Sequence, residues 1–321
     1  MAQFEKATVV ITTRNRREDL LKAIASVVAQ TAKPEVLVID DGSTDGTSAV
    51  VARQFPSVRL HRSEKSLGYI AQRNRAAQLV QTPIIFSIDD DAVFSTSQIV
   101  EDTLIEFEHP RVGAVAIPYV DVNQSSTVHQ QAPEPQGVHV AYDFKGTAHA
   151  LRRDIFLALG GYREILVHQS EEEDYCIRML NAGWITRLGN ADPIHHFESP
   201  RRSWSRMDFH GARNKILYAW HNIPFPAVVL QLAGRTAKAI VFSLQPGRML
   251  TRGRGLLNGY YVCVMGQAER RPVNPVIYRL SQELKLRRAI PLQEIENQLP
   301  RQHAQETQNW EKPRIASEIN R

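Results

Sequence analysis

The sequence predicts an α/β protein whose mostly parallel sheet is covered by helices on both faces, followed by a helical and basic C-terminal region. In the first 120 residues, runs typical of buried strands alternate with runs whose apolar residues recur every three or four positions, as on one helix face. This alternation favours parallel strands, because each helix carries the chain back to the edge where the previous strand began. Beyond about residue 205, the sequence has helical patterns rich in Lys and Arg.

The expected elements follow one another regularly along the chain. Strands are expected at 7–12, 36–40, 58–62 and 83–88, and helices at 18–30, 69–80 and 96–107. The polar stretch 121–140 has no period and is expected to be a loop that leaves the sheet. Order resumes with a short helix that ends at Gly160-Gly161 and with a helix at 171–184, which opens with acidic residues.

Composition indicates a globular protein in a reducing compartment. Of 321 residues, 43% are hydrophobic and 23% are charged, which is ordinary for a water-exposed globular chain. The two cysteines, Cys176 and Cys263, cannot form a disulfide framework. The N-terminus lacks the apolar run of a signal peptide, and the longest apolar stretch, 223–244, is interrupted by charged residues. We therefore expect a cytoplasmic protein.

Charge is distributed unevenly between the two parts of the chain. Residues 1–200 carry a net charge of −7, whereas residues 201–321 carry +12. This asymmetry predicts an anionic partner for the C-terminal part, and amphipathic runs such as VVLQLAGRTAKAIVF predict peripheral contact with the inner face of the cell membrane. The alternatives are a solvated basic surface without a partner, helices that cover the sheet domain, and a homodimer contact.

The acidic run Asp89-Asp90-Asp91 directly follows the strand expected at 83–88. Three consecutive carboxylates at the end of a buried strand repel one another, which favours a bound cation. Oxygen ligands suit Mg²⁺ or Mn²⁺, whose shells are commonly completed by phosphate oxygens. The alternative is an acidic turn that caps the helix at 96–107.

Three further groups of polar residues are candidate site residues. Asp41 lies after the strand at 36–40, at the sheet edge where ligands of α/β proteins bind, and could accept hydrogen bonds from a base or ribose. Glu171 and Glu172 begin a helix, where crowding raises the pKa of at least one carboxyl, as a general base requires. His195 and His196 point to opposite faces of a strand, so one at most reaches a given metal.

The same segments resemble glycosyltransferase family 2 in order and spacing. They are VVITTRNRREDLLKAIASVVAQT, VLVIDDGSTDGT, YIAQRNRAAQLVQTPIIFSIDDDAVF, GTAHALRRDIFLALGGYRE and EEEDYCIRMLNAGW. The resemblance covers about residues 6–220. It implies a GT-A fold and an inverting transfer, assisted by a divalent metal, from a nucleotide-sugar to a hydroxyl of a glycan or lipid-linked acceptor.

The resemblance also implies roles for individual residues. The implied nucleotide-sugar contacts are Thr12, Arg14, Asp41, Arg73, Asp89 and Asp90. The implied metal ligands are Asp91, Asp89 and one of His195 and His196. Glu172 stands where the family usually has its aspartate base, so the base is either Glu172 or Glu171, and Asp174 is structural. The pair Arg213-Asn214 recurs in bacterial members of the family.

These expectations define three predicted regions. Residues 1–205 form a catalytic domain, with a donor half at about 1–118 and an acceptor half at about 140–205, residues 206–300 form a helical region, and residues 301–321 form a disordered tail. Two other functions are compatible with parts of the pattern. A metal-dependent nucleotidyltransferase acting on a sugar phosphate would also use paired acids. A nucleic-acid binder would explain the basic tail but not the acidic strand ends, so we expect no nucleic acid.

Overall fold

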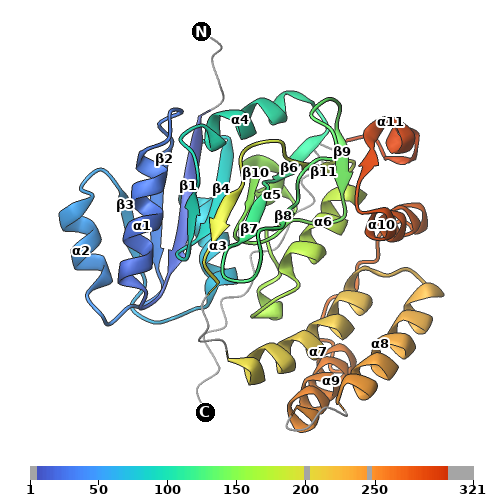
Figure 1. The fold of residues 1–321 in the computed structure, drawn as a ribbon. Coiled ribbons are helices and arrows are strands. Elements are labelled where there is room, and N and C mark those ends of the chain that lie inside the picture. Colours follow the sequence, from blue (N-terminus) through green and yellow to red (C-terminus); the bar gives the residue numbers. More distant parts are fainter. Residues whose placement is uncertain (1–5, 199–202, 244–247, 303–321) are drawn as a thin grey trace.

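A computed structural model describes residues 6–198, 203–243 and 248–302. Its centre is a mixed sheet with helices on both faces (Figure 1). In spatial order the strands of this sheet are β13 (Ile290–Pro291), β9 (His139–Ala141), β11 (Ile185–Leu188), β6 (Val112–Ala116), β10 (His149–Arg152), β4 (Ile84–Asp89), β1 (Ala7–Thr13), β2 (Glu35–Asp40) and β3 (Arg59–Arg62). The predicted N-terminal strands form its parallel part, β3-β2-β1-β4, whereas β10 runs antiparallel to both neighbours.

Helices bury both faces of the parallel part of the sheet. Those of the first 181 residues are α1 (Arg17–Val28), α2 (Thr47–Gln54), α3 (Tyr69–Leu79), α4 (Ile99–Ile105), α5 (Arg153–Ala158) and α6 (Glu171–Asn181), with short 3-10 helices at η1 (Glu106–Glu108) and η2 (Glu164–Leu166). Val9 and Ile11 of β1 pack in one apolar cluster together with α1, and Val10 packs in a second cluster together with α3. Because successive side chains alternate between faces, a strand buried on both faces is apolar throughout.

A second, smaller sheet lies beside the edge where β1, β2 and β4 end. Its strands, in spatial order, are β5 (Ala92–Phe94), β12 (Ile194–His196), β7 (Tyr119–Asp121) and β8 (Val128–His129). Parallel pairing of β12 with β7 sets His196 opposite Asp121. The polar stretch 121–140, predicted to be a loop, instead contains β8 and the start of β9. These strands are too short to produce a sequence period.

The C-terminal part begins with three helices that pack together beside the sheet domain (Figure 1). We call α7 (Trp204–Asn222), α8 (Ala227–Ser243) and α9 (Met249–Val264) the helical bundle. The chain then returns to the sheet domain through α10 (Pro275–Arg287), the edge strand β13, α11 (Leu292–Ile295) and η3 (Glu296–Gln298). Among the described residues after 205, the regular elements are thus helices apart from β13, which extends the large sheet next to β9.

The next two features are the predicted C-terminal tail and the helices that could cross a membrane. The tail predicted at 301–321 lies outside the described residues from 303 onward. Among the helices that the structure describes, none combines the length and the apolarity needed to cross a bilayer. The expected cytoplasmic location and the division at residue 205 stay predictions.

Two glycines allow α7 and α9 to pack closely. A Cβ atom at Gly255 would collide with the carbonyl oxygen of Phe209 on α7, and one at Gly259 would lie 2.9 Å from the carbonyl oxygen of Arg213. Without a side chain, α9 lies directly against the α7 backbone at both points. The bundle therefore depends on small residues at this crossing.

Replacing Gly255 should separate these helices. We expect Gly255→Ala to lower the free energy of unfolding by about 1–3 kcal/mol, the usual cost of overpacking. The matched change is Gly253→Ala on the same helix, where a Cβ meets nothing within 4 Å. That variant should gain up to about 1 kcal/mol from helix propensity. Urea denaturation of both variants checks the difference, and equal stability would contradict the close α7–α9 contact.

Candidate active site

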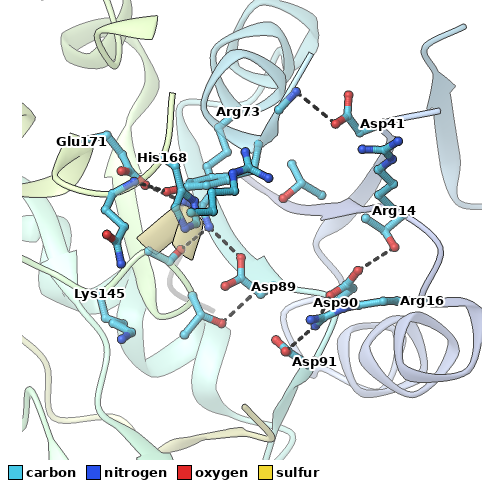
Figure 2. Close-up of a pocket in the computed structure, with 18 of the residues that line it drawn as sticks. Arg14, Arg16, Asp41, Arg73, Asp89, Asp90, Asp91, Lys145, His168 and Glu171 are labelled. Atoms are coloured by element: carbon cyan, nitrogen blue, oxygen red, sulfur yellow. Dashed lines mark hydrogen bonds and ion pairs between the residues drawn. The ribbon is translucent and has the colours of Figure 1, made fainter. Parts of the chain in front are cut away.

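A cavity of about 540 Å³ opens where the carboxyl ends of β1, β2 and β4 meet α6 and the start of α7. Figure 2 shows Asp89, Asp90 and Asp91 between Asp41 on one side and Glu171 on the other. Among the described residues, the carboxylates that line the cavity are Asp41, Asp89, Asp90, Asp91, Glu171 and Glu172, and the cationic side chains are Arg14, Arg16, Arg73, Lys145 and Arg206. Thr12 lines it as well, beside Asp89 in the β1–β4 register.

Asp89, Asp91 and His196 form a cluster suited to a divalent metal. One possible ligand atom from each lies within 4.8 Å of the others. The Nδ1 atom of His196 lies 2.5 Å from a carboxylate oxygen of Asp121, which can only accept, so Nδ1 carries the proton. The other ring nitrogen, Nε2, lies 3.4 Å from Asp91 Oδ1 on the cluster side, and the neutral ring would offer its lone pair to a metal there.

His195 and His196 are separated by the strand on which they lie. His196 lines the cavity, and His195 is not part of its lining or of the cluster. Neighbouring side chains of a strand point to opposite faces, which accounts for the difference. Asp121 was not predicted as part of the site, because it lies 75 positions before His196 and becomes its neighbour only through the β7–β12 pairing.

Asp90 lies outside the metal-binding cluster and contacts Thr13 and Arg16. It accepts hydrogen bonds from Thr13 Oγ1 at 2.7 Å and from Arg16 Nη1 at 3.2 Å. The same Arg16 nitrogen lies 2.5 Å from Asp91 Oδ2. Burial raises the pKa of Asp90 to about 7, and the Arg16 guanidinium opposes this shift. Arg16 was not predicted, although the run Arg14 to Arg17 contains three arginines from which only the first was selected.

Asp41 is held by the segment that leads into α3. Its carboxylate accepts hydrogen bonds from Ser66 Oγ at 2.6 Å, Gln72 Nε2 at 2.6 Å, and the backbone nitrogens of Leu67 and Gly68. Burial alone would raise the pKa of Asp41, but these donors lower it, Gln72 and Ser66 most strongly. Arg14 donates to the same Ser66 at 3.1 Å. The structure thus brings Asp41 and Arg14 together at one end of the cavity.

Arg73 connects the acids of β4 with those of α6. It is almost completely buried and donates to Asp89 Oδ1 at 2.7 Å, to the carbonyl oxygen of Gly146 at 3.0 Å and to Glu171 Oε1 at 3.5 Å. Its guanidinium also lies over the ring of Tyr69. Despite burial, the neighbouring negative charges raise the pKa of Arg73, so it remains a cation. Arg73 therefore holds the two acidic groups at a fixed separation.

Glu171 and Glu172 differ in how far they are exposed to the cavity. Glu171 is completely buried against Arg73, whereas Glu172 is half-buried and lies against Gly146, where a Cβ atom would be 2.5 Å from Glu172 Oε1. Burial raises the pKa of both carboxyls, and Arg73 opposes the shift in both. Glu172 is thus the member of the pair with an ionisable oxygen nearer to solvent.

The turn before α6 is strained and is held from α7. Val167, Gln169 and Ser170 all have positive φ angles between 61° and 70°, which non-glycine residues rarely adopt. Asn214 Nδ2 donates to the carbonyl oxygens of Leu166, His168 and Gln169 at 2.8–2.9 Å. The neighbouring Arg213 donates to Ile165 O at 2.7 Å and to Asn258 of α9. The predicted Arg213-Asn214 pair therefore fixes the turn that delivers Glu171 and Glu172.

Asp174 lies one turn further along α6 and faces away from the cavity. It is completely buried and paired with Arg163 and, at 3.0 Å, with Arg178, and it accepts a hydrogen bond from Asn222 at 2.7 Å. Burial alone would raise its pKa, but Arg178 and Arg163 lower it to about 2. These contacts are structural, as expected for this position.

Comparison with known proteins agrees with this geometry. Residues 8–163 match the family model described as Glycosyl transferase family 2. This segment, just under half of the chain, carries the similarity to glycosyltransferase family 2. The match covers β1 to β10 and hence Thr12, Asp41, Arg73 and the acidic run, whereas Glu171, Glu172 and the histidines lie beyond it.

Two curated bacterial proteins are similar to this chain. The succinoglycan biosynthesis protein ExoU of Rhizobium meliloti is 27% identical over 228 residues, which are 69% of this chain and 61% of that protein. The N-acetylglucosaminyl-diphospho-decaprenol L-rhamnosyltransferase of Mycobacterium tuberculosis is 27% identical over 235 residues, 59% of this chain and 75% of that protein. The matched segment thus spans less than two thirds of ExoU.

Solved glycosyltransferases share the fold. Residues 1–349 of S. aureus TarS in complex with UDP-GlcNAc align with a TM-score of 0.60 at 15% identity, over 88% of this chain and 89% of that chain. The mannosyltransferase PcManGT from Pyrobaculum calidifontis, solved with GDP-Man and Mn²⁺, aligns with a TM-score of 0.55 at 16% identity, over 83% and 88%. The predicted GT-A fold with a helical C-terminal region is therefore confirmed.

The Asp174 cluster should make the folded state of this chain sensitive to acid. The lowered pKa means that Asp174 stabilises the folded state above the unfolded value near 3.8 and loses this effect as pH falls towards 2. We expect Asp174→Asn to lower the free energy of unfolding by roughly 3–5 kcal/mol at neutral pH, because it leaves two buried arginines without their partner.

Urea denaturation between neutral pH and pH 3 measures this effect. The difference between wild type and Asp174→Asn should shrink with acid, because the wild type loses the ion pairs that the variant already lacks. Asp192→Asn, at an exposed position, is the control and should follow the wild type throughout. A constant difference at all pH values would show that the charge of Asp174 is not what stabilises α6.

Proposed function

We propose that this chain is an inverting glycosyltransferase that moves a sugar from a nucleoside diphosphate sugar to a hydroxyl group of a glycan or lipid-linked acceptor. The observation that carries the proposal is one cavity that contains both a metal-binding cluster and a partly exposed carboxylate of raised pKa. Asp89, Asp91 and His196 form the cluster, and Glu172 is the carboxylate. The match of residues 8–163 to the family model described as Glycosyl transferase family 2 supports the reaction class.

The cluster has the donor set of a Mg²⁺ or Mn²⁺ site. Two carboxylates and one neutral imidazole are ligands that Mn²⁺ accepts, and few protein ligands leave positions open for phosphate oxygens. Asp121 fixes the His196 ring through Nδ1, as carboxylates behind metal-binding histidines commonly do. When bound, such an ion neutralises charge on a departing nucleoside diphosphate. Asp91, Asp89 and His196 would hold it.

Cationic side chains of the cavity support binding of the donor diphosphate. Arg16 lies against Asp90 and Asp91, and Lys145 lines the wall near Glu172. Thr12, Arg14 and Asp41 lie at the opposite end, where we place the nucleoside, with Asp41 on the base. Related structures were solved with UDP-GlcNAc and with GDP-Man, so both nucleotides fit this fold.

Glu172 is our choice for the general base. It removes a proton from the acceptor hydroxyl, whose oxygen then attacks the anomeric carbon from the face opposite the leaving group. The sugar thereby inverts, and no covalent bond to the protein is needed. Glu171 is too deeply buried to reach an acceptor and instead holds Arg73 beside Asp89.

The names of two relatives support our choice of acceptor class. One of them is named as a rhamnosyltransferase acting on a diphospho-decaprenol glycolipid, and another as a succinoglycan biosynthesis protein. We therefore propose a bacterial cell-surface glycan, carried on lipid diphosphate, as the acceptor. A nucleotidyltransferase is the competing function, and it would release pyrophosphate from a nucleoside triphosphate.

Metal dependence separates the two histidines. In a thermal-shift assay with UDP or GDP, Mn²⁺ should raise the melting temperature of the wild type. His196→Ala should need an Mn²⁺ concentration about tenfold higher or more for the same shift in melting temperature, because the imidazole is a ligand held by Asp121. The matched variant is His195→Ala on the opposite strand face, which should retain the response. If both variants respond like the wild type, the metal site lies elsewhere.

The two glutamates should differ in the transfer reaction. Glu172→Gln should reduce kcat by about 10²–10⁴-fold, because the acceptor hydroxyl loses its base. For the wild type, kcat/KM should fall as pH drops through the raised pKa of Glu172, above the usual glutamate value of 4.5, because only the deprotonated form accepts a proton.

Nucleoside diphosphate release from a panel of nucleotide-sugars measures these rates. Thermal shift with nucleotide and Mn²⁺ is the control that Glu172→Gln still binds the donor. If Glu172→Gln retains transfer and Glu171→Gln loses it while still binding the donor, the base is Glu171. Release of pyrophosphate from a triphosphate would instead establish nucleotidyl transfer.

A further inference from the structure

The outer face of α8 is apolar and uncovered. Its exposed side chains recur every three to four positions, and they are Val229, Leu230, Ala233, Ala237, Lys238 and Val241, preceded by Phe225. Leu230 is 77% exposed. The opposite side of the helix is used for packing, since Thr236 bonds Tyr260 of α9 and Arg235 bonds the backbone of α7. This amphipathic helix therefore turns its apolar face outward, the reverse of a helix that covers a core.

The outer face of α9 is similar. Leu250, Leu257, Tyr261 and Val264 are all exposed, Leu257 by 71%. Gly255 and Gly259 face α7, and Tyr260 faces α8. By helical position, the exposed residues of both helices flank the α8–α9 contact on the side away from α7. We call this combined surface of α8 and α9 the outer bundle face.

The bundle carries almost no negative charge. From residue 203 to 264 the sequence contains eight Lys and Arg residues and one acid, Asp208. That acid is buried and paired with Arg248 and Arg252 at 2.6–2.9 Å, so it does not offset the remaining cations. Lys238 and Arg254 are exposed on α8 and α9 themselves. The outer bundle face is therefore apolar with cations along it.

We propose that the outer bundle face docks on the surface of an anionic phospholipid bilayer. A helix lying in the interface buries apolar side chains among the lipids while its cations meet the headgroups. A second copy of this chain fits the face less well, because two strongly basic bundles would repel each other. The sequence pattern predicted such contact for α8, and the structure adds α9 and the position of both faces.

The start of α9 contacts the end of α7 that lines the cavity. Ser203, Arg206 and Met207 at the start of α7 line the cavity. Arg248, at the start of α9, pairs with Asp208 and lies over the ring of Trp204, which is 60% exposed. Docking through α8 and α9 would therefore bring this end of α7 close to the headgroups. A lipid-linked acceptor could then reach Glu172 without leaving the membrane, a consequence that rests on the proposed function.

Flotation with vesicles tests the docking directly, with the full chain and no donor or acceptor. The wild type should float with phosphatidylcholine vesicles that contain phosphatidylglycerol, should not float with pure phosphatidylcholine, and should detach as salt is raised. The double variant Leu230→Gln/Leu257→Gln should lower the partition coefficient by about tenfold or more. Arg254→Gln should lower it by about five-fold, as expected for one cation at an anionic surface.

Leu286→Gln is the matched control. Leu286 is 84% exposed but lies on α10, outside the bundle, so its variant should float like the wild type. All substituted side chains are exposed, and unchanged circular dichroism and melting temperature verify folding. Wild type that stays unbound at low salt overturns the proposal, as does an equal loss in Leu286→Gln. A dimer in sedimentation that Leu257→Gln dissociates would assign the face to a second copy.

The docking and the proposed function can fail separately. Vesicle flotation depends on the bundle alone, whereas nucleotide-dependent thermal shifts depend on the cavity. Flotation without any response to nucleotide and Mn²⁺ would support docking and contradict the proposed donor site. A thermal shift with nucleotide but no flotation would be consistent with the proposed transfer reaction and would contradict the proposed membrane docking.

Discussion

Buried negative charge at the carboxyl end of the sheet is the constraint on which the site depends. Six carboxylates line one cavity among the described residues, and burial raises the pKa of Asp90, Glu171 and Glu172. Arg16, which precedes α1, and Arg73 of α3 compensate part of this charge. Arg73 does so most completely, because its buried guanidinium meets Asp89 and Glu171 at once. The separation of the acids of β4 and α6 is therefore set by one side chain.

This constraint explains which parts of the site could be predicted from sequence. Asp41 and the acidic run follow buried strands, and the ends of parallel strands meet at one edge, so strand order is enough to bring them together. Arg16 and Asp121 could not be found in this way. Each acts on a residue 75 positions away in the sequence, and neither has a local pattern. Arg16 reaches Asp91 from the turn before α1, and Asp121 reaches His196 through β7–β12 pairing.

The sequence also does not distinguish between adjacent residues of the same type. Glu171 and Glu172 have the same chemistry. If the motif alignment can shift by one residue, it cannot show which of the two is the base. The structure distinguishes them, because Arg73 from α3 buries one and Gly146 leaves room for the other. His195 and His196 are separated by strand alternation, but only the pairing of β12 with β7 shows which face meets the cavity. Both choices depend on residues distant in sequence.

Hydrogen bonds connect the helical bundle to the turn that precedes α6 in the cavity wall. The bundle therefore helps to position residues of the cavity. Arg213 links Asn258 of α9 to the turn before α6, and Asn214 holds three carbonyls of that turn. Because the turn is strained, it keeps its conformation only while these bonds persist. Displacement of α9 relative to α7 would therefore be transmitted to Glu171 and Glu172. The close glycine packing of α9 on α7 opposes such a displacement. The position of Glu171 and Glu172 therefore depends on the helical bundle.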